Sequence, residues 1–294
     1  MGRARALAAA LALALALALP AAAAERFAKG LLWQVSRQGV APSYVFGTIH
    51  LPDPRVLEIP EPVLRALAEA RIYAMETPQA EGHQWRLYEA AQFEDGRTLA
   101  SVVGDETFGQ VRAALAPRAI PEPVIARLKP WAALANIQVA PEGYAHVTLD
   151  ERLFALARVQ RLKFEVLEGT EEHIAVFDGI PLETQVAMLR HTLEHRDALA
   201  AMIEPTLQAW LRRDLAGIRA VNERIAARYP AMTPHYRVFM RHVVEHRSIV
   251  MAHRLHLRLR SGRVFVAVGA THLYGDQSLL RLIERQGYRV TRLY

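Results

Sequence analysis

Two segments at opposite ends of the chain follow the same pattern, and this internal similarity constrains the fold most strongly. Residues 44–77 and 264–294 each read as an apolar strand, a Gly-x-x-His-Leu turn, a loop, a helix and a second strand. In a β-helix-β unit the two strands normally run parallel and the connection is right-handed. The carboxyl ends of such strands meet at one sheet edge, where open α/β sheets place their ligands. We therefore expect both turns at the same edge.

The rest of the chain alternates between strand-like and helix-like stretches. Apolar spacing predicts helices over 60–70, 149–161 and 277–285, and strands over 72–75, 163–167, 264–268 and 288–293. Two long stretches, 85–140 and 182–227, read as helical and are interrupted by prolines. The sequence predicts an α/β fold: a mixed sheet with paired β-(GxxH)-α-β units at the two ends of the chain and a helical middle.

The first residues have the pattern of a secretory signal peptide over 1–24. Arg3 and Arg5 precede an apolar run over 6–19, and small residues follow up to Ala24. The apolar run is shorter than the roughly 20 residues that span a bilayer, which favours a cleaved signal over a membrane anchor. We expect cleavage near Ala24, a secreted or periplasmic location, and no stable membrane insertion after cleavage.

The composition of the mature chain limits how it is stabilised and what it binds. The sequence contains no cysteine, so a hydrophobic core and not disulfides must stabilise it. Loss of Arg3 and Arg5 lowers the formal net charge from +6 to +4, and the remaining basic residues are dispersed among acids. We expect a single domain over 25–294 and no nucleic-acid partner.

The histidines of the two turns, His50 and His272, are candidate metal ligands together with Glu76 at the end of an apolar strand. Two imidazoles and a carboxylate suit an open site for divalent Mn, Co, Fe or Zn. Gly47 and Gly269 begin the turns, and a residue without Cβ lets a ligand approach the backbone. Two alternatives stay open: each histidine bonds a backbone carbonyl as an ordinary loop residue, or Glu76 forms a salt bridge.

Arg247 lies between Val243 and Met251 on the apolar face of its helix. A charge that faces inward needs an anionic partner. Glu76 and Glu168, each at the end of a strand, are the candidates. Arg247 either neutralises one of these carboxylates or stabilises negative charge on a substrate.

A second group of histidines, His242, His246 and His253, lies on the opposite face of that helix. The first two have the spacing of a helical metal pair but lack the acidic partner of an H-E-x-x-H motif, so an exposed stripe is the simpler interpretation. The chain also lacks a G-x-S-x-G elbow and a phosphate-binding loop. These absences argue against a zincin, a serine hydrolase and a nucleotide enzyme.

Several stretches spread over the mature chain fit one family pattern. They are YVFGTIHL, YAMET, LKPWAA, LDERLFALA, VLEGTEEHIAVFDGIPLETQ, AWLRRDL and VAVGATHLYGDQSLLRLIERQGYRVTRL. With these motifs the chain resembles the TraB/GumN family. That family is similar to the Tiki-type metalloproteases and, more remotely, to ChaN-like haem-binding and erythromycin-esterase-like proteins. The resemblance implies an EreA/ChaN-like α/β fold with paired Gly-x-x-His motifs.

The resemblance also implies roles for individual residues. His50 and His272 correspond to the motif histidines, Glu76 to the acidic site residue and Arg247 to the family arginine. The chain departs from the pattern at two positions, with Ser248 where the family commonly has Asn and His173 where it often has Gln. The candidate cofactor-contacting residues are Gly47, Gly269, Ser248 and Glu168.

Three functions fit these residues. The first is a metal-dependent hydrolase of the periplasm or cell exterior, a metalloprotease that cleaves a peptide or protein substrate, with Arg247 or a histidine stabilising the oxyanion. The second is a non-catalytic haem- or metal-binding envelope protein that uses the same histidines. The third is a metal-free, esterase-like mechanism with one histidine as general base. At the level of the sequence these alternatives and the oligomeric state stay open.

Overall fold

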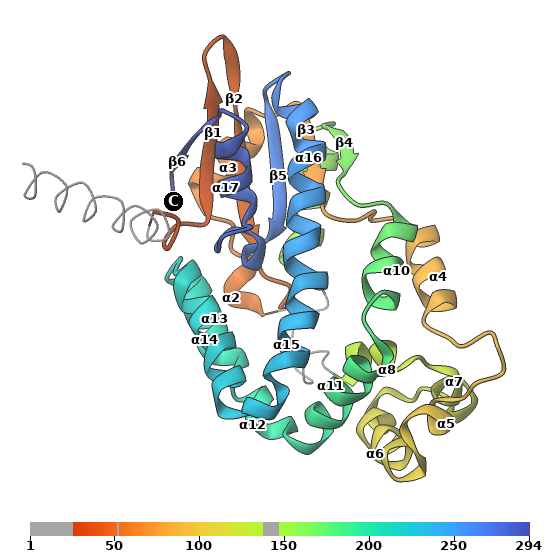
Figure 1. Cartoon of the computed structure of the whole chain (residues 1–294). Coiled ribbons are helices and arrows are strands. Elements are labelled where there is room, and N and C mark those ends of the chain that lie inside the picture. Colours follow the sequence, from red (N-terminus) through yellow and green to blue (C-terminus); the bar gives the residue numbers. More distant parts are fainter. Residues whose placement is uncertain (1–25, 52, 138–146) are drawn as a thin grey trace, which may run out of the picture.

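A mixed six-stranded sheet with helices around it forms the centre of the protein. The computed structural model describes residues 26–51, 53–137 and 147–294 (Figure 1), so the expected signal peptide lies outside the described residues. The strands are β1 (Leu32–Arg37), β2 (Val40–Thr48), β3 (Ile72–Met75), β4 (Lys163–Val166), β5 (Val264–Gly269) and β6 (Arg289–Arg292). Their order in the sheet is β4-β3-β5-β2-β1-β6, and this confirms the predicted α/β class and mixed sheet.

The first two strands form an antiparallel hairpin. In this hairpin β2 begins at Val40, before the apolar residues 44–46. Gly39 adopts a φ of +76° between the two strands, a conformation that glycine reaches without steric cost. β1 pairs with β2 on one side and antiparallel with β6 on the other. The hairpin therefore ties the carboxyl-terminal strand to the rest of the sheet.

The central strands run parallel and end at one edge of the sheet. β5 pairs in parallel with both β2 and β3, and β3 pairs in parallel with β4. In this register Thr48 lies opposite Gly269, and Met75 lies opposite Ala267. The residues that follow β2, β3 and β5 therefore come together although they are far apart in the sequence.

The apolar core is built on both faces of this sheet. Tyr73 and Phe265 stack on neighbouring strands with ring centroids 6.0 Å apart and an interplanar angle of 9°. The helices that add buried side chains to this core are α2 (Pro54–Leu57), α3 (Glu61–Ala68), α9 (Leu149–Val159), α13 (Ile203–Leu211), α14 (Leu215–Arg228), α16 (Arg247–Leu259) and α17 (Leu279–Arg285). In Figure 1, α16 runs along the sheet beside α17. Helices α13 and α14 pack against each other below the sheet.

A second apolar cluster lies among helices away from the sheet, at the lower right of Figure 1. Its helices are α5 (Leu99–Val103), α6 (Asp105–Leu115), α7 (Glu122–Arg127), α8 (Pro130–Ile137) and α11 (Leu182–Glu194). The remaining helices are α4 (Glu81–Ala90), α10 (Thr170–Asp178), α12 (Arg196–Ala200), α15 (Thr233–Met240) and the π-helix η3 (Arg241–His246), with short 3-10 turns η1 (Ala116–Arg118), η2 (Pro230–Met232) and η4 (Ala270–His272). Within the described residues, no helix is long and apolar enough to span a membrane.

Candidate functional site

Three of the predicted site residues converge on the backbone of Gly269, the last residue of β5. A Cβ atom placed on Gly269 would lie 3.2 Å from Nε2 of His50, 3.4 Å from Oε1 of Glu76 and 3.8 Å from Cδ2 of His272. The backbone of Gly269 has φ −55° and ψ 136°, which other residues also adopt. The absence of a side chain, and not an unusual backbone conformation, is therefore what the site requires at this position.

The carboxylate of Glu76 is held from several sides. Its Oε1 accepts a hydrogen bond from the backbone N–H of Gly269, and its Oε2 accepts one from Nη2 of Arg247 at 2.8 Å. Burial raises the pKa of Glu76, but the charges of His272, Arg247 and His50 outweigh burial and hold this pKa at about 2. Glu76 is therefore ionised at neutral pH.

Arg247 contacts both of the carboxylates that the sequence proposes for it. Its Nε donates to Glu168 at 2.8 Å and 3.0 Å, and its Nη2 contacts Glu168 and Glu76 at 2.8 Å. The π-helix η3 ends immediately before Arg247, and Nη1 donates back to the carbonyl of Val243 at 3.3 Å. Each nitrogen of the guanidinium thus has a protein partner.

His272 is buried at the turn after β5, with its ring between two polar contacts. Its Nδ1 lies 2.9 Å from Oγ of Ser248, and its Nε2 lies 3.8 Å from Oε1 of Glu76. Burial lowers the pKa of His272, and the charge of Glu76 acts in the opposite direction. The lowered pKa favours a neutral imidazole, which is the form that binds a metal or accepts a proton.

His50 is exposed, and it has a partner that the sequence did not reveal. Its Nδ1 lies 2.9 Å from Oδ2 of Asp150, while Thr48 donates its hydroxyl to the other oxygen of the same carboxylate at 2.7 Å. Desolvation lowers the pKa of His50, but the imidazole is largely open to solvent, and the hydrogen bond and charge of Asp150 raise the pKa to about 9. The sequence offered one signal: Thr148 and Glu151 form a capping box that marks the start of α9.

The two motif glycines have different surroundings. A Cβ on Gly47 would meet the side chain of Leu273 at 2.7 Å and the backbone of Ala270 at 3.2 Å. The carbonyl of Gly47 also accepts a hydrogen bond from the indole of Trp210 at 3.1 Å. Gly47 therefore lets β2 pack against the turn after β5, whereas Gly269 faces the histidines.

The donor atoms suit a divalent metal in kind. Zinc ligands lie about 2.0–2.2 Å from the ion in a tetrahedral arrangement, so two ligands of one ion are about 3.3–3.6 Å apart. The 3.8 Å between Nε2 of His272 and Oε1 of Glu76 is slightly longer than that spacing. In the part of the chain that the structure describes, however, no three His, Cys, Asp or Glu side chains are close enough to hold a metal as they stand. A metal would therefore bind only after these side chains rearrange.

The family is decided by a comparison that covers nearly the whole described chain. Residues 31–292 match the model of the TraB/PrgY/gumN family. The chain belongs to this family. No curated protein and no solved structure matches it.

Ser248 and His173, the two positions at which the resemblance implied a departure from the family pattern, both contact this site. Ser248 is fully buried against His272. His173 places its Nδ1 3.4 Å from Oε2 of Glu168, and its ring centroid is 5.6 Å from that of His83. Both departures are therefore next to the ionic network and not at the protein surface.

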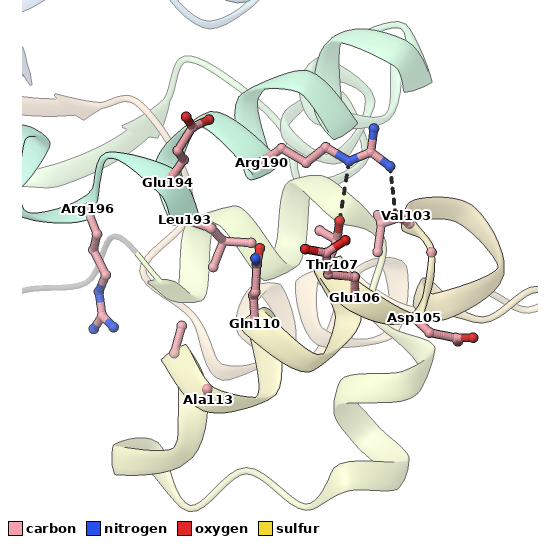
Figure 2. Close-up of a pocket in the computed structure, with 12 residues that line it drawn as sticks. Val103, Asp105, Glu106, Thr107, Gln110, Ala113, Arg190, Leu193, Glu194 and Arg196 are labelled. Atoms are coloured by element: carbon pink, nitrogen blue, oxygen red, sulfur yellow. Dashed lines mark hydrogen bonds between the residues drawn. The ribbon is translucent and has the colours of Figure 1, made fainter.

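A hollow of about 820 Å³ lies elsewhere on this TraB/PrgY/gumN chain, between α6 and the end of α11 (Figure 2). There Arg190 donates to the carbonyl of Val103 at 2.7 Å and to the hydroxyl of Thr107 at 3.4 Å. The residues around it carry charges of both signs, and none of them is a predicted site residue. We therefore give more weight to the sheet edge, where the ionisable groups converge.

Proposed function

We propose that this chain is a metal-dependent hydrolase, a peptidase, that binds a divalent ion through His50, His272 and Glu76. The observation that carries the proposal is the convergence of His50 Nε2, Glu76 Oε1 and the His272 ring on the backbone of Gly269. This donor set suits Mn, Co, Fe or Zn. A metal of this kind, when bound, activates water as a nucleophile near neutral pH.

In this proposal Arg247 acts as a counter-charge. Its Nε and Nη2 are engaged by Glu168 and Glu76, and its Nη1 donates to the carbonyl of Val243, so its donors are directed mainly at the protein's own carboxylates. Its positive charge keeps Glu76 ionised in a buried position, where a lone carboxylate would be costly. The structure thus favours the first of the two roles considered for Arg247.

We also propose that the two Gly-x-x-His turns are matched units of an EreA/ChaN-like fold and that the protein works in the periplasm or outside the cell. The parallel pairing of β2 with β5, with Thr48 opposite Gly269, supports the matching of the turns. The pattern of residues 1–24 supports export. A peptide or protein as the substrate is proposed from the resemblance to the Tiki-type metalloproteases.

The decisive experiment uses the exported protein purified without a histidine tag. The protein is treated with chelator, supplied with Mn, Co, Fe or Zn in turn, and incubated with a diverse peptide library whose products are read by mass spectrometry. We expect cleavage with at least one metal and a loss of about 100-fold or more in His50→Ala and His272→Ala. His253→Ala, on the exposed face of α16, is the control that keeps activity.

Two other outcomes would replace the proposal. Cleavage that persists in the presence of chelator would support the metal-free mechanism with a histidine as general base. Absence of cleavage with every metal, together with a haem absorbance band that disappears in His50→Ala or His272→Ala, would support the non-catalytic binding protein.

A further inference from the structure

We infer that Asp150 and Ser248 are positioning residues that set the tautomer of both motif histidines in their neutral form, with the proton on Nδ1 and the lone pair on Nε2. The two residues come from different elements, the first turn of α9 and the first turn of α16. Each contacts one histidine, His50 or His272, at its Nδ1 atom. The expected effect on metal affinity rests on the proposed function. The assignment of the tautomers does not depend on it.

The contact between Asp150 and His50 has only one possible direction. An ionised carboxylate accepts hydrogen bonds and cannot donate them. The 2.9 Å between Oδ2 of Asp150 and Nδ1 of His50 therefore requires a hydrogen on Nδ1. The hydroxyl of Thr48 donates to Oδ1 of the same carboxylate at 2.7 Å, which fixes the plane of the carboxylate.

The carbonyl oxygen of Val244 determines which group donates in the hydrogen bond between Ser248 and His272. The hydroxyl oxygen of Ser248 lies 2.8 Å from the carbonyl oxygen of Val244, and two oxygens at this distance need a hydrogen between them. A serine hydroxyl has one hydrogen, and the carbonyl has none to give. Ser248 must therefore accept from Nδ1–H of His272 at 2.9 Å. The opposite tautomer would place a hydrogen on Nε2, where Glu76 Oε1 at 3.8 Å is too far to accept it.

The Asp150–His50 and Ser248–His272 hydrogen bonds have the same effect on the two imidazoles. Once Nδ1 of each ring is engaged, Nε2 is the atom left to face Gly269 and Glu76. A partner that fixes the tautomer and orientation of a histidine typically changes metal affinity 10–100-fold when it is removed. Asp150 and Ser248 thus prepare both imidazoles for the same ligand.

The test reads the tautomers directly. Long-range ¹H–¹⁵N spectra of the metal-free protein distinguish Nδ1–H from Nε2–H imidazoles, and His50→Ala and His272→Ala assign the two signals. The spectra are recorded at pH 10, above the His50 pKa of about 9, so that the ring is neutral. We expect Nδ1–H for both residues in the wild type. An Nε2–H signal assigned to either histidine in the wild type would refute the inference.

Variants then test each positioning residue separately. Asp150→Asn introduces an amide that can donate, so we expect His50 to shift towards the Nε2–H form while His272 is unchanged. Ser248→Ala should shift His272 alone. Ser248→Asn, whose amide oxygen still accepts from Nδ1, should restore the His272 signal. Asp95→Asn, a change at an exposed carboxylate that pairs with Arg97, is the matched control.

The same variants separate this inference from the proposed function. Titration with Zn²⁺ alone in a calorimeter measures the affinity for the metal. This affinity should be about 10–100-fold weaker in Asp150→Asn than in the wild type. If the wild-type tautomers are as stated but no Zn²⁺ binds, the hydrolase proposal fails and the positioning roles stand. If Zn²⁺ binds and the tautomers do not respond to Asp150→Asn or Ser248→Ala, the positioning roles fail alone.

Discussion

Nε of Arg247 donates to a carboxylate oxygen of Glu168 at 2.8 Å in the protein interior, where 8% and 3% of the two side chains are exposed. Water has little access to either group, so neither charge is hydrated if its partner is lost. A second carboxylate, Glu76, shares the same guanidinium at 2.8 Å. One arginine therefore stabilises two acids, the buried Glu168 and the largely buried Glu76, and the ionic network depends on it.

Arg247→Ala should destabilise the protein by about 3–5 kcal/mol, because it leaves Glu76 and Glu168 buried without a counter-charge. Urea unfolding followed by circular dichroism measures this difference. Arg219→Ala is the control, since Arg219 is 52% exposed in its pair with Glu223 and should cost less than about 1 kcal/mol. A melting temperature of Arg247→Ala close to that of the wild type, together with lost activity, would instead assign Arg247 to the transition state.

Acid should weaken the native state partly through Glu76. The pKa of this carboxyl is lowered from 4.5 to about 2, so its stabilising contribution is complete above pH 4.5 and is lost as the pH falls through about 2. We expect the free energy of unfolding of the wild type to fall more steeply between pH 4.5 and 2 than that of Glu76→Gln. Urea midpoints across this range provide the comparison, and parallel curves would contradict the ionised state assigned to Glu76.

Gly269→Ala should impair the site while the fold is kept. The added methyl would lie 3.2 Å from Nε2 of His50, which must move by a few tenths of an ångström, and 3.4 Å from Oε1 of Glu76, which is close to ordinary contact. The backbone of Gly269 already has a conformation that alanine adopts, so we expect a stability loss of about 1 kcal/mol or less. Metal affinity or peptide cleavage should fall at least about 10-fold. Gly109→Ala, whose methyl meets no atom within 4 Å, is the control.

Ser248→Asn tests the departure from the family pattern. Ser248 is fully buried, so the larger amide should cost about 1–3 kcal/mol through overpacking. Because the amide can still accept from Nδ1 of His272, activity per folded molecule should be at least that of the wild type. Thermal melts and kinetics on the same sample separate the two effects, and lost activity with an unchanged melting temperature would contradict this account.

The mature protein should begin at or near Glu25. The small residues Ala22 and Ala24 supply the positions that precede cleavage by a signal peptidase. N-terminal sequencing of the exported protein measures this directly. Recovery of an intact Met1, or of membrane-bound protein that keeps the apolar run, would contradict the prediction.

The features that repeat in the sequence were the ones that could be predicted. Because the Gly-x-x-His pattern occurs twice after apolar strands, the approach of His50, His272 and Glu76 to one another followed from β-helix-β geometry. The apolar run Ile72–Met75 was predicted as a strand and is β3. The local pattern was sufficient to predict this strand, because a strand that is buried on both faces of its sheet has a continuous apolar sequence.

The features that depend on distant partners were not visible. Asp150 lies 100 positions from His50, and an acid in the first turn of a helix is ordinary without any functional role. Strand β1 has mixed burial and is defined by its pairing with β2 and β6. The helix predicted over 149–161 ends at Val159, and Arg161 then takes a φ of +57° to begin the turn into β4. Long-range contacts decided the first two of these outcomes, and the local backbone conformation decided the third.

The position of β5 has a consequence for the order in which a newly made chain acquires structure. β5 lies between β2 and β3, although it begins at Val264 whereas these strands end at Thr48 and Met75. Until residues 264–269 leave the ribosome, β2 and β3 lack the strand that joins them, and the second histidine does not yet exist. No nascent chain shorter than this can display the assembled site, so a premature release at any earlier codon yields a protein without it.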